Sequence, residues 1–214
     1  MADPVLLDQY IAGHISPEED YLWELDRETN LKTIRSRMLS GHLQGQLLSI
    51  ISCMIRPRCI LEIGTFTGYS ALCLAKGLAE GGKLHTIEID DEVELIARKY
   101  FHLSGMVDRI IQHIGDARAI IPGIQQSFDL VFIDADKREY CDYYKLVFDR
   151  IPVGGFLLAD NVLWDGKVVD PDAQGEEQTR GILAFNDLVQ NDPRVKNVIL
   201  TVRDGIMLIQ KIAE

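Results

Sequence analysis

From Cys59 onward, short and mostly apolar runs alternate with longer stretches in which apolar residues recur at helical spacing. The apolar runs are CILEI, KLHTIEI, RIIQHI, FDLVFI and GGFLLA. Strands that are buried on both faces need no polar alternation, so this pattern predicts a parallel sheet covered by helices on both sides. We therefore expect the α/β fold class.

The end of the chain follows a different pattern. The runs VKNVILTV and IMLIQKI are joined by Asp204-Gly205, a pair typical of two-residue hairpin turns. The last strand is therefore expected to run antiparallel. Together with the five parallel strands before it, the hairpin makes seven expected strands.

Before about residue 58 the pattern predicts helices and no strands. Ser16, followed by Pro17 and a run of acids, is typical of a helix start, because serine accepts an unpaired backbone N–H there. We expect a helix from about 17 to 29, and a second over 46–55 that ends before Arg56-Pro57. The chain is thus expected to be one domain spanning 1–214, with 1–55 as an N-terminal helical extension.

Composition narrows the function classes. The chain has 214 residues, 47% hydrophobic and 26% charged, which is ordinary for a globular protein. With 22 basic against 33 acidic residues, its formal charge of −11 opposes nucleic-acid binding. The four cysteines show no CxxC spacing and are expected to be reduced and mostly buried. We expect a cytoplasmic protein without a membrane segment, since eighteen apolar residues never run together and the N-terminus is acidic.

A glycine turn follows the first expected strand. In LEIGTFTGYS, Gly64 and Gly68 are separated by three residues, which differs from the GxGxxG of dinucleotide-binding proteins. Such a turn lets a ligand approach the backbone at the sheet edge where open α/β sheets bind ligands. The alternative is a plain connection between strand and helix.

Glu88 ends the second expected strand, twenty residues beyond Gly68. An acid at this place can accept hydrogen bonds from both hydroxyls of a ribose, although it can also be a solvated acid or a helix cap. Asp116 follows the third strand, with the same two interpretations: contact with the base of the ligand, or a cap. The glycine turn and Glu88 together favour a ligand that contains a nucleoside.

Two aspartates end the fourth and fifth expected strands. Asp134 closes LVFID, and Asp160 closes GGFLLAD with Asn161 directly after it. Neighbouring strands lie about 4.8 Å apart, so the side-chain oxygens of these residues should lie close together. Two carboxylates at such a short distance repel each other unless a cation or a proton lies between them. The set suits Mg²⁺, Mn²⁺ or Ca²⁺ rather than zinc. Lys137, in the same loop as Asp134, either acts on a substrate hydroxyl or is an ordinary surface lysine.

Several motifs together resemble the cation-dependent O-methyltransferases, a family that includes catechol O-methyltransferase and the caffeoyl-CoA O-methyltransferase group with its bacterial relatives. The motifs are MLSGHLQGQLLS, LEIGTFTGYSALCLA, IEID, FIDADK, DNVLW and DGIMLIQK, and the resemblance runs from Met38 to Lys211. It implies the class I methyltransferase Rossmann-like fold with strand order 3-2-1-4-5-7-6, the cofactor S-adenosylmethionine, a divalent cation, a small aromatic substrate and a homodimer.

The resemblance also implies roles for individual residues. Glu62, Gly64 and Ser70 would hold the methionine end of S-adenosylmethionine, Glu88 the ribose, and Asp116 with Ala117 the adenine, with Met38 near the reactive methyl. Asp134, Asp160 and Asn161 would bind the metal, with Mg²⁺ favoured. Lys137 would be the catalytic lysine, and Asp134 would act in catalysis and contact the cofactor as well. Asp136 replaces an aromatic residue of catechol O-methyltransferase, which favours the caffeoyl-CoA branch.

We therefore expect transfer of a methyl group to a hydroxyl of a vicinal dihydroxy-aromatic substrate such as a catechol, a flavonoid or a caffeoyl compound. Lys32, Arg35 and Arg37 either line the entrance for an anionic thioester or are ordinary surface charges. Trp164 and the loop 165–178 either cover the aromatic ring or form a surface connection. Two alternatives of other classes are an NAD-binding oxidoreductase, disfavoured by the missing GxGxxG, and a non-catalytic cofactor-binding protein of the same fold.

Overall fold

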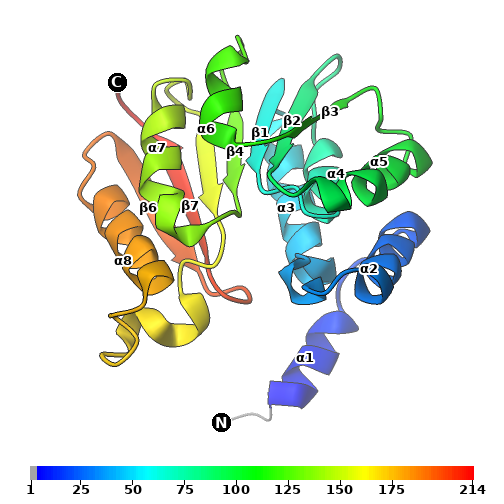
Figure 1. Cartoon of the computed structure of the whole chain (residues 1–214), viewed down its shortest axis with the longest axis horizontal. Helices are drawn as coiled ribbons and strands as arrows, with labels where there is room; N and C mark the ends of the chain where they lie inside the picture. The colour runs from blue at the N-terminus through cyan, green and yellow to red at the C-terminus, as the bar shows by residue number, and fades with distance from the viewer. Residues whose placement is uncertain (1–3) are drawn as a thin grey trace.

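A single seven-stranded sheet forms the centre of the computed structural model, which describes residues 4–214 (Figure 1). Its order is β3-β2-β1-β4-β5-β7-β6, and β7 runs antiparallel to both of its neighbours. The strands are β1 (Cys59–Ile63), β2 (Lys83–Glu88), β3 (Ile110–Ile114), β4 (Leu130–Ile133), β5 (Phe156–Ala159), β6 (Val195–Leu200) and β7 (Ile206–Lys211). The expected strand number, order and antiparallel last strand are confirmed.

Helices cover both faces of the sheet (Figure 1). The α-helices are α1 (Pro4–Ala12), α2 (Asp20–Lys32), α3 (Gly41–Ile55), α4 (Tyr69–Ala75), α5 (Glu94–Leu103), α6 (Ala117–Ile120), α7 (Tyr140–Phe148) and α8 (Glu177–Gln190). The 3-10 turns are η1 (Ser36–Met38), η2 (Asp91–Val93), η3 (Ile121–Gly123), η4 (Lys137–Glu139) and η5 (Trp164–Val169).

The sheet separates two hydrophobic cores. Along β4, Val131 and Ile133 pack in the core under α7 and α8, whereas Leu130 and Phe132 pack in the core shared with α2–α5. All four of these side chains are fully buried. This burial on both faces is the physical reason for the unbroken apolar runs of the sequence.

The N-terminal helices differ from the expected ones in where they begin. The prediction that a helix starts near residue 17 with Ser16 as its cap is wrong, because α2 begins at Asp20 and its cap position is Glu19. The residues before α2 make tertiary contacts instead: the carbonyl of Ser16 accepts a hydrogen bond from His42 (2.9 Å), and Glu18 accepts one from Tyr69. The second helix, α3, starts five residues earlier than expected, at Gly41, and ends at Ile55 as expected.

The N-terminal segment contributes to the core. Leu25 and Leu48 are fully buried among residues of α4 and β4. The segment Ser36–Ile55 is long and apolar enough to cross a membrane by length and composition, with 39% of the window buried inside the protein. Within it, the Ser52 hydroxyl donates to the carbonyl of Leu74 in α4 (2.6 Å), so α3 packs as a core helix.

The C-terminal hairpin has a longer turn than expected. Asp204-Gly205 lies in a five-residue connection, 201–205, so the prediction of a two-residue turn is wrong. The reason is tertiary, because the N–H groups of Val162 and Leu163 donate to the carbonyls of Gly205 and Asp204, both at 3.0 Å. A Cβ on Gly205 would lie 2.4 Å from the Leu163 side chain, so the turn and the chain after β5 are in close contact.

All four cysteines are free, as expected. Cys59 and Cys73 are buried, Cys141 is partly buried and Cys53 is exposed, so only part of the expectation of burial is met.

Candidate active site

Asp134 and Asp160 lie side by side at the carboxyl edge of the sheet. In the strand register, Ile133 of β4 pairs with Ala159 of β5, so the two aspartates follow directly paired residues. The N–H of Asp160 donates to the carbonyl of Ile133 (2.9 Å), and the N–H of Asp134 donates to that of Ile63 (2.8 Å). The structure thus brings together the two carboxylates that the sequence predicts to converge.

The environment of Asp160 disfavours its charge. Its side chain is buried, and burial, together with the negative charge of Asp134, raises its pKa. Hydrogen bonds from Gln44 and from the N–H of Asn161, and the charge of Lys137, oppose this rise. A buried carboxylate beside a second one favours a proton or a cation between them.

Lys137 is buried, so the interpretation as an ordinary surface lysine does not hold. Its ammonium donates to Oδ1 of Asp134 (2.8 Å) and to the hydroxyl of Tyr140 (2.7 Å). The Tyr140 hydroxyl donates in turn to the backbone carbonyl of Asp160 (3.1 Å). Lys137 is therefore held in place on η4, with its charge directed to the two aspartates.

The donor set fits a hard divalent cation. Two carboxylates and the amide of Asn161 supply oxygen atoms, the ligands that Mg²⁺ and Ca²⁺ prefer. Asn161 adopts the left-handed conformation (φ 57°), which sharply turns the chain after β5. Within residues 4–214, no group of three or more His, Cys, Asp or Glu side chains is arranged to hold a metal, so the amide would complete any such site.

The glycine turn after β1 packs tightly against the backbone of Asp134 and against α5. Gly64 has φ 103°, and a Cβ there would lie 1.9 Å from the backbone oxygen of Asp134. Gly68 has φ 93°, and its Cβ would lie 2.7 Å from the ring of Phe101. Both positions therefore need glycine, and the turn joins the ends of β1 and β4 into one surface.

Glu62 supplies an unpaired acceptor under this turn. It is fully buried, and its Oε2 accepts a hydrogen bond from Thr86 (2.5 Å). Its Oε1 is buried without a partner in the part of the chain that the structure describes. Burial raises the pKa of Glu62 to about 8, against the opposing effect of the Ser70 and Thr86 hydroxyls. An unsatisfied buried carboxyl oxygen fits an ammonium group of a bound ligand.

Glu88 lies at the end of β2 with its carboxylate bound to the backbone. Oε2 accepts from the N–H of Phe66 in the glycine turn (2.6 Å), and Oε1 accepts from the N–H groups of Ile89 (2.9 Å) and Asp90 (3.0 Å). A carboxylate has about four acceptor positions, so these bonds leave room for about one donor from a ligand. The carboxylate of Glu88 therefore links β2 to the glycine turn instead of capping a helix.

Asp116 performs the capping role that the sequence left open. Its Oδ1 accepts from the N–H of Arg118 at the start of α6 (2.8 Å), and its Oδ2 pairs with the guanidinium of Arg118 (2.8 Å). This pairing lowers the pKa of Asp116. Ala117 is buried at the start of α6, and Met38 is half-exposed at the end of η1. The predicted contacts of these residues with a cofactor stay predictions.

The loop after the predicted metal ligands contains a 3-10 turn and is hydrogen-bonded to the C-terminal hairpin. It begins with η5, in which Trp164 (φ 49°) and Asp165 (φ 54°) adopt left-handed conformations. The indole N–H of Trp164 is buried without a partner among residues 4–214. The loop is tied to the C-terminal hairpin, since the N–H of Asp165 donates to the side chain of Asp204.

Two residues of the site were not predicted. Gln44 on α3 donates from Nε2 to Oδ2 of Asp160 (2.5 Å), and Tyr140 on α7 joins Lys137 to Asp160. Gln44 lies 116 residues from Asp160 in the chain, and no local pattern marks such a contact. The motif QGQ within the resembling segment was the available signal, but it does not show which glutamine points inward.

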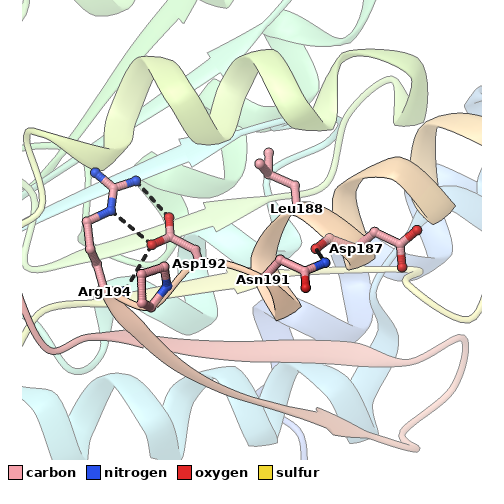
Figure 2. Close-up of a pocket in the computed structure, with 6 residues that line it drawn as sticks. Asp187, Leu188, Asn191, Asp192 and Arg194 are labelled. Carbon is pink, nitrogen blue, oxygen red and sulfur yellow. Dashed lines mark hydrogen bonds and ion pairs between the residues drawn. The ribbon is translucent and has the colours of Figure 1, made fainter.

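Two hollows lie elsewhere in the described part of the chain. One of about 470 Å³ is lined by residues from Asp187 to Arg194, at the end of α8 and the start of β6 (Figure 2). There the guanidinium of Arg194 pairs with Asp192 (2.7 Å) and lies over the ring of Phe148. Its charge is therefore compensated by contacts within the fold. A second hollow of about 320 Å³ includes Arg37 and Arg203 beside the start of α3.

The comparisons with known proteins agree with this geometry. The sheet order and a site at the carboxyl ends of β1, β4 and β5 define a class I methyltransferase. Residues 12–212 match the family model described as O-methyltransferase. The chain belongs to this family, which confirms the resemblance drawn from the sequence.

Proteins similar to this chain are named as O-methyltransferases. The caffeoyl-CoA O-methyltransferase 1 of Eucalyptus globulus is 34% identical over 97% of this chain and 89% of its own length. The crystal structure of the O-methyltransferase TomG from Streptomyces achromogenes, in complex with S-adenosylmethionine, superposes with a TM-score of 0.89 at 27% identity and covers 97% of this chain and 96% of that one. An O-methyltransferase from Bacillus cereus, in complex with S-adenosylhomocysteine, gives 0.89 at 28% identity, covering 96% and 97%.

Proposed function

We propose that the protein transfers the methyl group of S-adenosylmethionine to a hydroxyl of a vicinal dihydroxy-aromatic compound, with a divalent cation at Asp134, Asp160 and Asn161. Membership of the O-methyltransferase family supports the reaction class and argues against an NAD-dependent oxidoreductase. The observation that carries the proposal is the arrangement at the sheet edge of Asp160 and Lys137, which are buried, with Asp134, which is largely enclosed.

The glycine turn supports S-adenosylmethionine as the methyl donor. Structures of similar proteins contain this molecule or its demethylated product. In this chain the unpaired Oε1 of Glu62 would accept from the ammonium of the donor, and Gly64 with Ser70 would hold the rest of its methionine end. Glu88 would bind a ribose hydroxyl through its remaining acceptor position.

The acid pair supports the cation. Asp134, Asp160 and Asn161 would hold it through oxygen atoms, and adjacent hydroxyls of a catechol would complete its coordination. A bound divalent cation supplies Lewis acidity, which lowers the pKa of a hydroxyl that touches it. A phenol has a pKa near 10, so ionising it at pH 7 costs about 4 kcal/mol without such help.

Lys137 is the residue best placed to stabilise the negative charge that develops on the substrate oxygen. Its ammonium donates hydrogen bonds to Asp134 and Tyr140, so it is fixed within the site and can stabilise a developing phenolate. Tyr140 and Asp134 orient it, and the burial of Lys137 and Tyr140 limits the access of bulk water to the reacting groups. The methyl group must then be attacked in line, which these fixed elements favour by positioning.

The test is a panel of catechols, flavonoids and hydroxycinnamoyl thioesters assayed for methyl transfer with and without a chelator. We expect methylation of at least one vicinal diol and its loss on addition of EDTA, with recovery when Mg²⁺ is restored. Methylation that is insensitive to EDTA would overturn the role of the metal. Binding of S-adenosylmethionine without transfer to any diol would favour a non-catalytic cofactor-binding protein.

We also propose that the protein is a homodimer. Exposed apolar side chains on the N-terminal helices support this: Leu6, Leu7 and Tyr10 on α1, and Ile50 and Met54 on α3. Light scattering coupled to size exclusion should give twice the mass of one chain, and the monomer mass would contradict the proposal. The cytoplasmic location stays a prediction.

A further inference from the structure

Gln44 is the one residue of the N-terminal helices whose side chain donates to the acid pair in the described part of the chain. It is buried on α3, and its Nε2 lies 2.5 Å from Oδ2 of Asp160. The sheet positions Asp160 through its backbone, whereas the orientation of its carboxylate depends on what the two oxygens contact.

Those contacts are few. Oδ1 of Asp160 accepts from the N–H of Asn161 (2.7 Å), and Oδ2 accepts from Gln44. The ammonium of Lys137 donates to Asp134 rather than to the carboxylate of Asp160. Gln44 is therefore the side chain that sets the rotation of this carboxylate, and without it Oδ2 would be buried with no donor.

The helix that carries Gln44 is rigidly placed. Gly45, the next residue, lies against α4, where a Cβ would come 2.6 Å from the Tyr69 ring and 2.8 Å from Sγ of Cys73. At the other end of the contact, a Cβ on Gly77 would lie 2.1 Å from the backbone of Ser52. Since α4 starts directly after the glycine turn, α3 is fixed relative to the site at both ends.

The chemistry of an amide suits this place. An amide N–H holds a carboxylate oxygen without adding a positive charge beside the site. A lysine at position 44 would add a positive charge that opposes a cation, and an apolar residue would leave Oδ2 unpaired. Partners of metal ligands in other proteins orient the ligand and tune its affinity in this way.

We propose that Gln44 is a positioning residue of the cation site: it holds the Asp160 carboxylate in the orientation that binds the metal. The inference rests on the proposed function, because it presupposes a cation at Asp160. It assigns to the N-terminal helical segment a direct part in building the site.

The experiment measures binding of Mn²⁺ to the full chain by the electron paramagnetic resonance signal of the free ion, without substrate. The variant Gln44→Met keeps the length of the side chain and removes the donor. The matched control is Gln46→Met, because Gln46 lies on the same helix and its amide contacts the carbonyl of Ser16 instead. S-adenosylmethionine binding and the melting temperature are measured for each protein.

We expect Gln44→Met to weaken Mn²⁺ binding by about 10- to 100-fold, with S-adenosylmethionine binding near that of the wild type and Gln46→Met unchanged. A merely structural role would lower the melting temperature and affect both ligands. The second variant, Gln44→Asn, keeps an amide on a side chain one methylene shorter. It carries the test if Gln44→Met does not fold, and it should also bind Mn²⁺ more weakly.

Equal Mn²⁺ affinity in wild type and folded Gln44 variants would overturn this inference and leave the proposed function intact. Failure of the wild type itself to bind Mn²⁺ would overturn the metal role in the proposed function, and this inference with it. Loss of Mn²⁺ binding in Gln46→Met to the same extent would also overturn the inference, because the effect would then belong to the helix.

Discussion

The ammonium of Lys137 lies 2.8 Å from Oδ1 of Asp134, three residues away across the turn that follows β4. Both side chains are largely enclosed, so the pair is held within the site instead of being dispersed in solvent. This contact joins a predicted catalytic group to a predicted metal ligand.

Replacing Lys137 should reduce the rate and spare cofactor binding. We expect Lys137→Met to lower kcat by about 10²- to 10⁴-fold, because the site loses the group that stabilises the ionising hydroxyl. Affinity for S-adenosylmethionine, measured by calorimetry, should stay near the wild-type value. Lys145→Met, on the exposed face of α7, is the control and should remain active. A Lys137→Met enzyme with wild-type kcat would contradict the assignment.

Removing the buried ligand should abolish turnover. In Asp160→Ala the cation site loses one of its two carboxylates, so we expect no measurable methyl transfer at any Mg²⁺ concentration and nearly intact S-adenosylmethionine binding. The same change at Asp187, which lines the remote hollow of Figure 2, should leave activity unchanged. Near-normal activity of Asp160→Ala would refute the metal role.

Binding of S-adenosylmethionine should depend on pH through Glu62. The pKa of this buried carboxyl is about 8, so it holds its proton at pH 7 in the free protein. An ammonium placed at Oε1 favours the ionised form, so binding should release a proton at pH 7 and tighten as the pH rises towards 8. Calorimetry in two buffers of different ionisation enthalpy measures the released proton.

Glu62→Gln should remove that proton release and weaken binding by roughly 10- to 100-fold, the value of one hydrogen bond between charged groups. Glu80→Gln, at an exposed position, is the comparison and should behave as wild type. Proton release that persists in Glu62→Gln would show that another group is responsible.

Stability at mildly acidic pH should depend on His85. This residue of β2 is buried, its Nδ1 lies 3.0 Å from Nε2 of His113, and its Nε2 has no hydrogen-bond partner among the described residues. Burial, with smaller contributions from His113 and Arg150, lowers its pKa to about 4. The unfolded chain takes up this proton near pH 6.5, so the contribution is full above 6.5 and is lost as the pH falls from there through 4.

We expect the resulting loss to be about 1 to 2 kcal/mol of unfolding free energy, measured by urea denaturation at pH 7 and pH 4.5. In His85→Leu the difference between the two pH values should shrink by this amount. His102→Gln, on the exposed face of α5, should keep the wild-type pH dependence. An unchanged pH dependence in His85→Leu would count against the buried neutral histidine as its cause.

The sequence pattern predicted the strands of the sheet correctly, because burial on both faces of β4 requires successive residues such as Val131 and Phe132 to be apolar. It also predicted that Asp134 and Asp160 lie close together, because adjacent parallel strands end at the same edge of the sheet and the residues that follow them are neighbours. It failed where local preference competed with a distant contact. Ser16 has the chemistry of a helix cap, yet its backbone is bound by α3 and the helix starts later.

What the sequence determined by itself was therefore the order of the elements and the carboxyl edge where acids, glycines and Lys137 gather, since these follow from periodicity and strand direction. Only the tertiary structure decided that Gln44 reaches Asp160 and that Glu62 keeps one oxygen unpaired. These outcomes depend on how closely α3, α4 and the sheet pack. Such distances between segments far apart in the chain leave no mark in the local pattern of residues.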